Sequence, residues 1–251
     1  MRIIRSINEL IVTLDEIFAD DYGKIGGEYT RWYRGQPDIR WALQPSVQRV
    51  REYTAKFESR ISNDFIMNAS VTMPNMPDNH EFSKWITIMQ HYGLPTRLLD
   101  WSESPLVALH FAVAPGQDDA DASFYVLNPG LLNRHELGHG YIYSLEQYTI
   151  SDLIYPAFRK NQRNEERADK IAACKPLVND RRVYAQHSAF TVHNSTRLLE
   201  SIGTPILEKL CIPADAKPSL RRELRLCSIS ERFLFPDLSH ITKDLRDRYD
   251  V

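Results

Sequence analysis

The sequence predicts a single α+β domain in which central mixed or antiparallel strands are flanked by helices. Segments rich in β-branched and aromatic residues fall mainly in the middle of the chain, whereas segments with apolar residues at helical spacing lie towards both ends. Strands and helices do not alternate regularly, as they would in a parallel α/β sheet. We therefore expect one main domain over residues 29–251, preceded by a helical segment over 1–28.

The first expected helix begins after Ser6, which can cap it, because Glu9 lies three residues later and completes a capping box. Glycines interrupt the helical pattern over 21–27. A strand follows over 29–34, and we expect Gly35 to end it. The other elements expected in this half are helices over 49–70, 83–91 and 105–114, the last capped by Ser102 or Ser104, a loop over 72–79 and an extended piece over 98–101.

The second half of the chain supplies most of the expected strands. Apolar and β-branched runs there are short and bounded by turn residues, which favours strands over long helices. We expect strands over 122–127, 141–145 and 206–212, extended pieces over 183–184 and 189–192, and helices over 165–174, 219–227 and 238–248.

Composition excludes several classes of protein. The 251 residues include 31 Lys+Arg and 33 Asp+Glu, for a formal net charge of -2, so no strong overall field attracts nucleic acid or an anionic membrane. Three widely spaced cysteines do not form a disulfide framework or a zinc knot. The N-terminal segment does not resemble a signal peptide, and no stretch is apolar enough to span a bilayer. We expect a cytoplasmic protein without membrane contact.

The first candidate site is the run Trp32-Tyr33-Arg34-Gly35-Gln36. A guanidinium presents five fixed donors that suit phosphate or carboxylate groups. Glycine allows a ligand or another backbone to approach closely. The alternative is that Arg34 only pairs with a buried carboxylate, for which Asp100 is a candidate.

The second candidate site is the polar, turn-rich run from Gln90 to Pro105. The apolar run over 106–113 that follows must be buried as a helix, so it would hold the preceding turn rigidly. The N-terminus of that helix also favours an anionic group. The alternative is a polar network that only closes the core.

The third candidate site is the run over 184–193. If it is a strand beside the pocket, Gln186 and Ser188 lie on one face and His187 on the other. The alternative is an edge strand with a solvated polar face.

A competing motif is His135-Glu136-Leu137-Gly138-His139, which matches the HExxH pattern of zinc proteases. On a helix both histidines would share one face, and Glu165 could be a third ligand. Glycines and Pro129 surround the motif and leave room only for a short helix. We therefore expect no metal site, and a zinc metalloprotease stays the second alternative function.

The three candidate runs together resemble the FRG domain family. The element that names the family appears as Tyr33-Arg34-Gly35, and its most specific stretch appears over 90–101. The run 185–191 is similar to a further element, with Ser188 in place of the usual glycine, and 234–238 also fits. These matches run from Arg31 to Leu238, so the resemblance implies an FRG domain over 29–251.

The same pattern resembles a reduced ADP-ribosyltransferase fold. Those enzymes place an Arg-Gly strand, a Ser-x-Ser run before a helix and a glutamate around NAD; here Gln186 stands at the glutamate position, although glutamine cannot take a proton. The resemblance implies a ring stacking on Tyr33, Tyr92 or Trp101 and charge stabilisation by Gln186 or Glu103. The implied catalytic residues are Arg34, Ser102, Glu103 and Gln186. The implied nucleotide-binding residues are Tyr33, Arg34, Gly35, Gln36, His91, Tyr92, Arg97, Asp100 and Trp101.

The leading hypothesis is an ADP-ribosyltransferase-like enzyme that uses NAD as a substrate and modifies a protein or nucleic-acid acceptor. The resemblance also implies a bacterial anti-phage or toxin effector. The alternative from another class is a non-catalytic module that binds a nucleotide or a protein through the same pocket.

Overall fold

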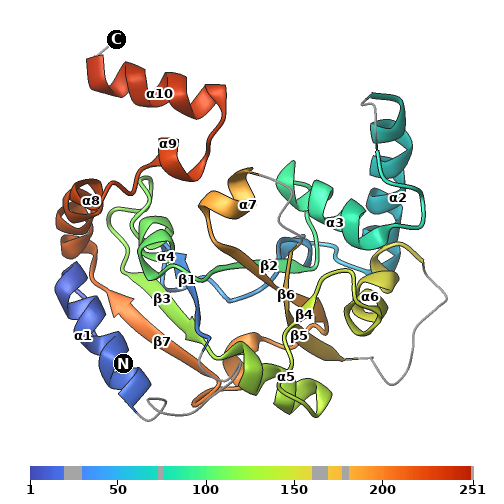
Figure 1. The fold of residues 1–251 in the computed structure, drawn as a ribbon, viewed down its shortest axis with the longest axis horizontal. Helices are drawn as coiled ribbons and strands as arrows, with labels where there is room; N and C mark the ends of the chain where they lie inside the picture. Colours follow the sequence, from blue (N-terminus) through green and yellow to red (C-terminus); the bar gives the residue numbers. More distant parts are fainter. Residues whose placement is uncertain (20–29, 73–75, 160–168, 177–180, 250–251) are drawn as a thin grey trace.

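The computed structural model describes residues 1–19, 30–72, 76–159, 169–176 and 181–249 (Figure 1). The predicted α+β class is confirmed: helices surround a seven-stranded mixed sheet. None of the helices in these ranges has the length and apolar character needed to cross a bilayer. The strands are β1 Trp32–Gln36, β2 Leu98–Ser102, β3 Ala122–Leu127, β4 Tyr143–Ser144, β5 Lys170–Lys175, β6 Ser188–Asn194 and β7 Leu207–Ile212. The α-helices are α1 Ile7–Phe18, α2 Ala55–Thr72, α3 Phe82–His91, α4 Pro105–Ala112, α5 Pro129–Leu137, α6 Tyr148–Ile154, α7 Arg181–Ala185, α8 Lys217–Leu226, α9 Glu231–Leu234 and α10 Leu238–Tyr249. Short 3-10 helices cover Ser46–Arg49, Tyr155–Ala157, Leu199–Ser201 and Ala214–Ala216.

The sheet consists of two halves that meet at one point. Its strand order is β4-β5-β6-β2-β1-β3-β7, so β2 and β1 are the neighbours at the centre. β1 pairs with β3 at five positions and β2 pairs with β6 at five positions. β1 and β2, by contrast, pair only at Tyr33 and Ser102. The two central strands therefore diverge from this pair and leave a split in the sheet.

Three apolar clusters fix the two halves. One cluster joins α1, α4 and α8 to β1, β3 and β7, and includes Leu10, Ala108 and Leu220. A second joins α2, α3 and α6 to β2, β5 and β6. A third includes Trp32, Trp101 and neighbouring strand residues of both halves. Helices thus pack on each half separately, while the third cluster contains residues of both halves and holds them together by burying their apolar side chains.

Local sequence signals position the helix that borders the split. Ser104 accepts a hydrogen bond from the N–H of Val107 and caps α4, and Pro105 occupies its first turn as predicted. Ser6 likewise caps α1 by accepting from the N–H of Glu9. The Glu9 carboxylate accepts from the N–H of Arg5 rather than from that of Ser6, so the capping box is shifted by one residue.

Several predicted elements are wrong or misplaced. The predicted helix over 165–174 is strand β5 from Lys170 onward. Four successive residues of this strand are buried, on both faces of the sheet, so the sequence lacks the alternation of a half-exposed strand. Residues 165–168 and 21–27 lie outside the described residues. The extended piece at 183–184 is helix α7. The helix predicted from 49 begins only at Ala55, and the strand predicted over 141–145 shortens to two residues.

Candidate functional site

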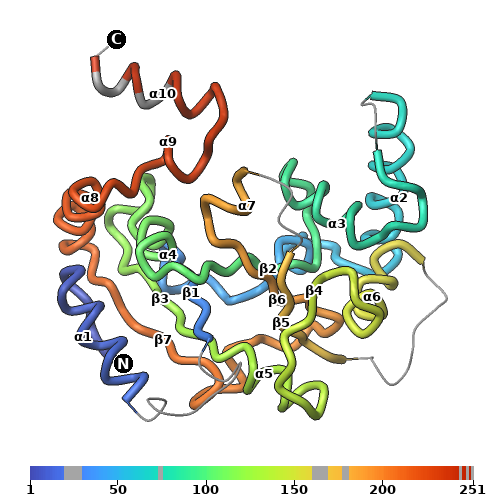
Figure 2. Tube along the Cα trace, in the orientation of Figure 1, coloured from blue at the N-terminus to red at the C-terminus, as the bar shows by residue number. Residues whose placement is uncertain are grey.

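A pocket of about 310 Å³ lies in the split between β1 and β2. This volume is at the small end of the range of ligand pockets, roughly 300–1,000 Å³. Figure 2 shows β1, β2 and β6, which are far apart in sequence, side by side at the centre of the molecule. All three candidate runs contribute to its lining. The lining residues are Tyr33, Arg34, Gly35, Gln36, Pro37, Trp41, Arg49, Asp100, Trp101, Ser102, Ala108, Phe111, Ala114, Arg182, Gln186 and Ser188.

Arg34 bridges the split. Its Nη1 donates a hydrogen bond of 2.6 Å to the backbone oxygen of Asp100, which β1 no longer pairs with at this point. The carboxylate of Asp100 lies 4.0 Å away and is 57% exposed, so it is a weak ion-pair partner. The buried Nε of Arg34 has no hydrogen-bond partner among the described residues. The guanidinium therefore has donors left for a ligand, because a buried donor without a partner is costly.

The electrostatics of the pocket favour an anion. Burial lowers the pKa of Arg34, the nearby Asp100 carboxylate raises it, and Arg49 lowers it further. Arg34, Arg49 and Arg182 line the pocket, whereas Asp100 is the carboxylate among its lining residues. The side chain of Arg49 makes no hydrogen bond or ion pair with the described part of the chain. Like charges placed this close favour a negatively charged group between them.

Gly35 allows α4 to pack directly on β1. A Cβ at this position would lie 2.0 Å from the backbone oxygen of Ala108 and 2.4 Å from the backbone nitrogen of Ala112. The expectation that glycine admits another backbone is thus confirmed, with α4 as that backbone. The strand was predicted to end at Gly35, but it continues to Gln36. The close contact brings Phe111 of α4 to the pocket wall.

Ser102 and Gln186 are joined by a hydrogen bond. The buried Ser102 Oγ donates to the backbone oxygen of Gln186 at 2.7 Å and accepts from the N–H of Ser104 at 3.0 Å. The possibility that the run over 184–193 is one strand does not hold at Gln186, which follows α7. The next residue, His187, has a positive φ of 46° before β6 begins. The side-chain amide of Gln186 donates to the backbone oxygen of Leu234 at 3.1 Å. Ser102 therefore fastens the third run to β2.

Tyr33 on β1 and Trp101 on β2 are aromatic residues that line the pocket, and both are buried. Burial raises the pKa of Tyr33 to about 12, so its phenol stays protonated, and able to donate a hydrogen bond, well above neutral pH. The indole N–H of Trp101 donates to Thr191, which keeps the ring fixed. Both residues were predicted, and both line the pocket.

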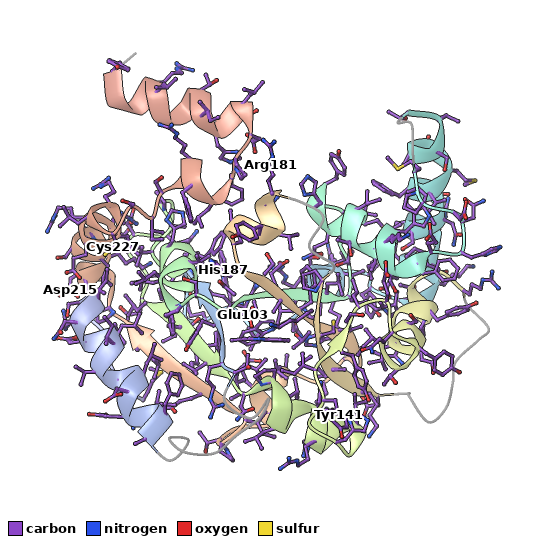
Figure 3. All side chains as sticks on the ribbon, in the orientation of Figure 1. Glu103, Tyr141, Arg181, His187, Asp215 and Cys227 are labelled. Carbon is purple, nitrogen blue, oxygen red and sulfur yellow. The ribbon has the colours of Figure 1, made fainter. Side chains whose placement is uncertain are left out.

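Four predicted site residues do not line the pocket. Arg97 is buried, and its guanidinium binds both carboxylate oxygens of Glu58 at 2.7 and 2.8 Å, so it stabilises the fold. Glu103 pairs with Lys175 at 2.8 Å. The backbone N–H of Glu103 donates to the backbone oxygen of His187, and Figure 3 shows these two residues close together. His91 and Tyr92 are exposed at the end of α3, and their rings pack on each other.

The lining residues that were not predicted as site residues include Trp41, Arg49 and Arg182, whose side chains are aromatic or charged. Trp41 is 42% exposed and lies in an irregular stretch, where no periodicity marks it. Arg182 belongs to the Arg181-Arg182 pair, so the adjacent positive charges were a signal in the sequence. The sequence contained no comparable signal for Arg49.

The geometry of the HExxH run contradicts the zinc alternative. α5 ends at Leu137, and Gly138 adopts a left-handed conformation, so His139 leaves the helical face of His135. The Glu136 carboxylate instead binds Arg197 at 2.8 Å and the N–H of Ile171. No cluster of potential metal ligands occurs within the described ranges; Glu165 lies outside them. The run therefore anchors α5 to β5.

Comparison with known families agrees with the geometry of the first two runs. Residues 30–121 match the model of the FRG domain, a range that includes β1, β2 and α4. The chain contains an FRG domain. The match lies within the predicted 29–251 range, and it covers the Arg34–Gly35 element and the Ser102 turn. Both line the pocket between β1 and β2, hereafter the FRG pocket. No curated protein and no solved structure matches the chain.

Proposed function

We propose that the FRG pocket binds NAD and that the protein is an ADP-ribosyltransferase-like enzyme. The observation that supports this most is the position of Arg34, whose guanidinium crosses the split and has an unpartnered donor in a pocket rich in arginine. Arginine suits a pyrophosphate because its planar donors match phosphate oxygens. The proposal includes a role as a toxin or anti-phage effector, for which modification of a protein or nucleic acid would be suitable chemistry.

The lining residues suit the two chemical parts of a dinucleotide. Arg34, Arg49 and Arg182 supply positive charge for phosphates, and Tyr33 and Trp101 supply ring faces for nicotinamide or adenine. Ser102 orders the wall between them through its bond to the Gln186 backbone. The pocket volume of about 310 Å³ suits one nucleotide half, with the other half extending from the open side.

The proposed reaction breaks the bond between nicotinamide and ribose C1′. The bonding electron pair leaves with nicotinamide, and the positive charge that develops on the ribose is stabilised by the side-chain oxygen of Gln186. The acceptor nucleophile then forms a bond to C1′, and its proton passes to Asp100, the carboxylate at the pocket. Glu103 has no part in this step because it is outside the lining, and its carboxylate pairs with Lys175.

The test is incubation with NAD labelled on the adenylate phosphate, together with protein, RNA and DNA acceptors, while released nicotinamide is measured in parallel. We expect label transfer and nicotinamide release that disappear in Arg34→Ala and persist in His135→Ala. His135 is a matched control because it is outside the lining and exposed. Activity that survives in Arg34→Ala would contradict the proposed site.

The second candidate function is a non-catalytic nucleotide-binding module. It is favoured by the amide at Gln186, which cannot accept a proton, and by the ion pair that holds Glu103. The two functions differ in one result. A binding module would retain ADP-ribose and NAD with an Arg34-dependent affinity, and it would release no nicotinamide.

A further inference from the structure

The segment from Leu234 to His240 lies against the pocket, although it is outside the lining. The backbone oxygen of Leu234 accepts a hydrogen bond of 3.1 Å from the Gln186 side chain. The Phe235 ring centroid lies 4.7 Å from the guanidinium carbon of Arg182. The same ring meets Phe111 edge to face at 6.1 Å. Gln186, Arg182 and Phe111 all line the pocket, so this segment contacts three of the lining residues from outside the pocket.

A second set of contacts links Phe235 to the last helix. The rings of Phe235 and His240 stack at 4.6 Å with an angle of 17° between their planes. His240 Nδ1 lies 2.7 Å from the carboxylate of Asp237, which also accepts from the N–H of His240 and caps the start of α10. Arg182, Phe235 and His240 therefore form a continuous series of contacts from the pocket to α10.

α10 projects from the rest of the molecule. Figure 1 shows it beyond α9, away from the sheet, and the figure places the C-terminus at its far end. Leu238 and Tyr249 on this helix are 81% and 69% exposed. A displacement of α10 would cost few apolar contacts at these positions, and it would act on the body through the stretch from Leu234 to His240.

We propose that Leu234–His240 is a positioning element that holds Arg182 and Gln186 in place for the ligand and transmits displacements of α10 to them. The identity of the ligand rests on the proposed function. The mechanical link from Phe235 to α7 does not, because these contacts form without any ligand. Phe235 and His240 are positioning residues, since neither lines the pocket.

The physical reason is preorganisation. An arginine side chain samples many rotamers in solvent, and fixing it on binding costs free energy. The ring of Phe235 restricts Arg182 beforehand through a cation–π contact. The bond from Gln186 Nε2 to Leu234 likewise fixes the amide, which leaves its side-chain oxygen and its second N–H for a ligand.

The experiment compares Phe235→Leu and Phe235→Tyr with Phe233→Leu. Phe233 is a matched control because it is a phenylalanine two residues earlier, in α9, and is 49% exposed. The first measurement, without ligand, is amide hydrogen exchange of residues 181–188, where the N–H of Gln186 bonds to the Arg182 oxygen. We expect faster exchange there in Phe235→Leu, and wild-type rates in Phe235→Tyr and Phe233→Leu.

The second measurement is calorimetric titration with ADP-ribose. Phe235→Leu should weaken binding about two- to tenfold, the size expected for one cation–π contact, and Phe235→Tyr should restore it. In Arg182→Ala, adding Phe235→Leu should weaken binding less than it does alone, because both changes remove one contact. His240→Ala should act in the same direction as Phe235→Leu.

The outcomes separate the two proposals. Unchanged exchange over 181–188 in Phe235→Leu would overturn the positioning role, whatever the ligand. Additive losses in the double variant would also overturn it. Failure of the wild-type protein to bind ADP-ribose would instead contradict the proposed function, and the exchange measurement would still decide the inference.

Discussion

Replacement of Gly35 by alanine should disturb the pocket without removing any of its charged or polar side chains. The new Cβ would lie 2.0 Å from the backbone oxygen of Ala108, whereas real Cβ contacts essentially never fall below 3.0 Å. The difference, 3.0 minus 2.0, requires α4 or β1 to move by at least about 1 Å. Because α4 carries Phe111, the pocket wall would move with the helix.

The cost should resemble that of overpacking a core, about 1–3 kcal/mol. For a chain of this length, each kcal/mol changes the melting temperature by about 2–4 °C, so we expect a decrease of about 2–12 °C. Urea unfolding would measure the free energy, and calorimetric titration with NAD would measure the affinity, which should fall.

Gly93→Ala is the control for this substitution. Gly93 has a φ of 79°, and a Cβ added there would have no atom within 4 Å, so the cost is backbone strain of about 1–2 kcal/mol. It should leave the affinity for NAD unchanged, because Gly93 is outside the lining. An unchanged unfolding midpoint in Gly35→Ala, with unchanged affinity, would refute the reasoning.

Three further substitutions test other parts of the structure. Arg97→Met should destabilise the fold by about 3–5 kcal/mol in urea unfolding because it leaves the buried Glu58 carboxylate unpaired. Adding Glu58→Met should recover much of this loss. A double variant that is as unstable as Arg97→Met alone would argue against the pairing. Burial lowers the pKa of His193 to about 3, with a further lowering by nearby arginines, so protonation of the unfolded state alone should reduce stability by roughly 1.4 kcal/mol per unit as pH falls from about 6.5 to 3. His193→Gln should flatten that slope, and parallel curves of stability against pH would show that His193 is not responsible. Ser102→Ala should cost about 1 kcal/mol and speed amide exchange near Gln186, whereas wild-type exchange would show that their hydrogen bond is unimportant.

Sequence reasoning succeeded where a signal is local. Ser104 and Pro105 mark the start of α4 by the residue types that caps and first turns require. Gly35 indicated a close approach because only glycine lacks a Cβ. The apolar run after Pro105 correctly predicted a buried helix that fixes the preceding turn.

It failed where the answer depends on a distant partner. Arg34 is the last residue of one predicted strand and Arg97 directly precedes another, yet Arg97 is paired with Glu58, 39 residues earlier, and Arg34 lines the pocket. No local pattern identifies a partner at that separation. Similarly, the split in the sheet depends on the register of β1 and β2, which pair at a single position. Register is set by tertiary packing when so few pairs are formed.

β5 shows a related limit for secondary structure. Its run of alanines and a cysteine has helical composition, but it pairs with β6 and is buried on both faces. Tertiary burial therefore outweighed the intrinsic propensity of alanine for helices.

The central claim is that a nucleotide binds in the split between β1 and β2 through Arg34. A crystal structure of the protein with ADP-ribose tests it most directly. We expect phosphate oxygens within hydrogen-bond distance of the Arg34 guanidinium and a ring against Tyr33 or Trp101. Ligand density elsewhere, such as in the open cavity beside β7 that Arg2 and Lys209 line, would contradict the claim.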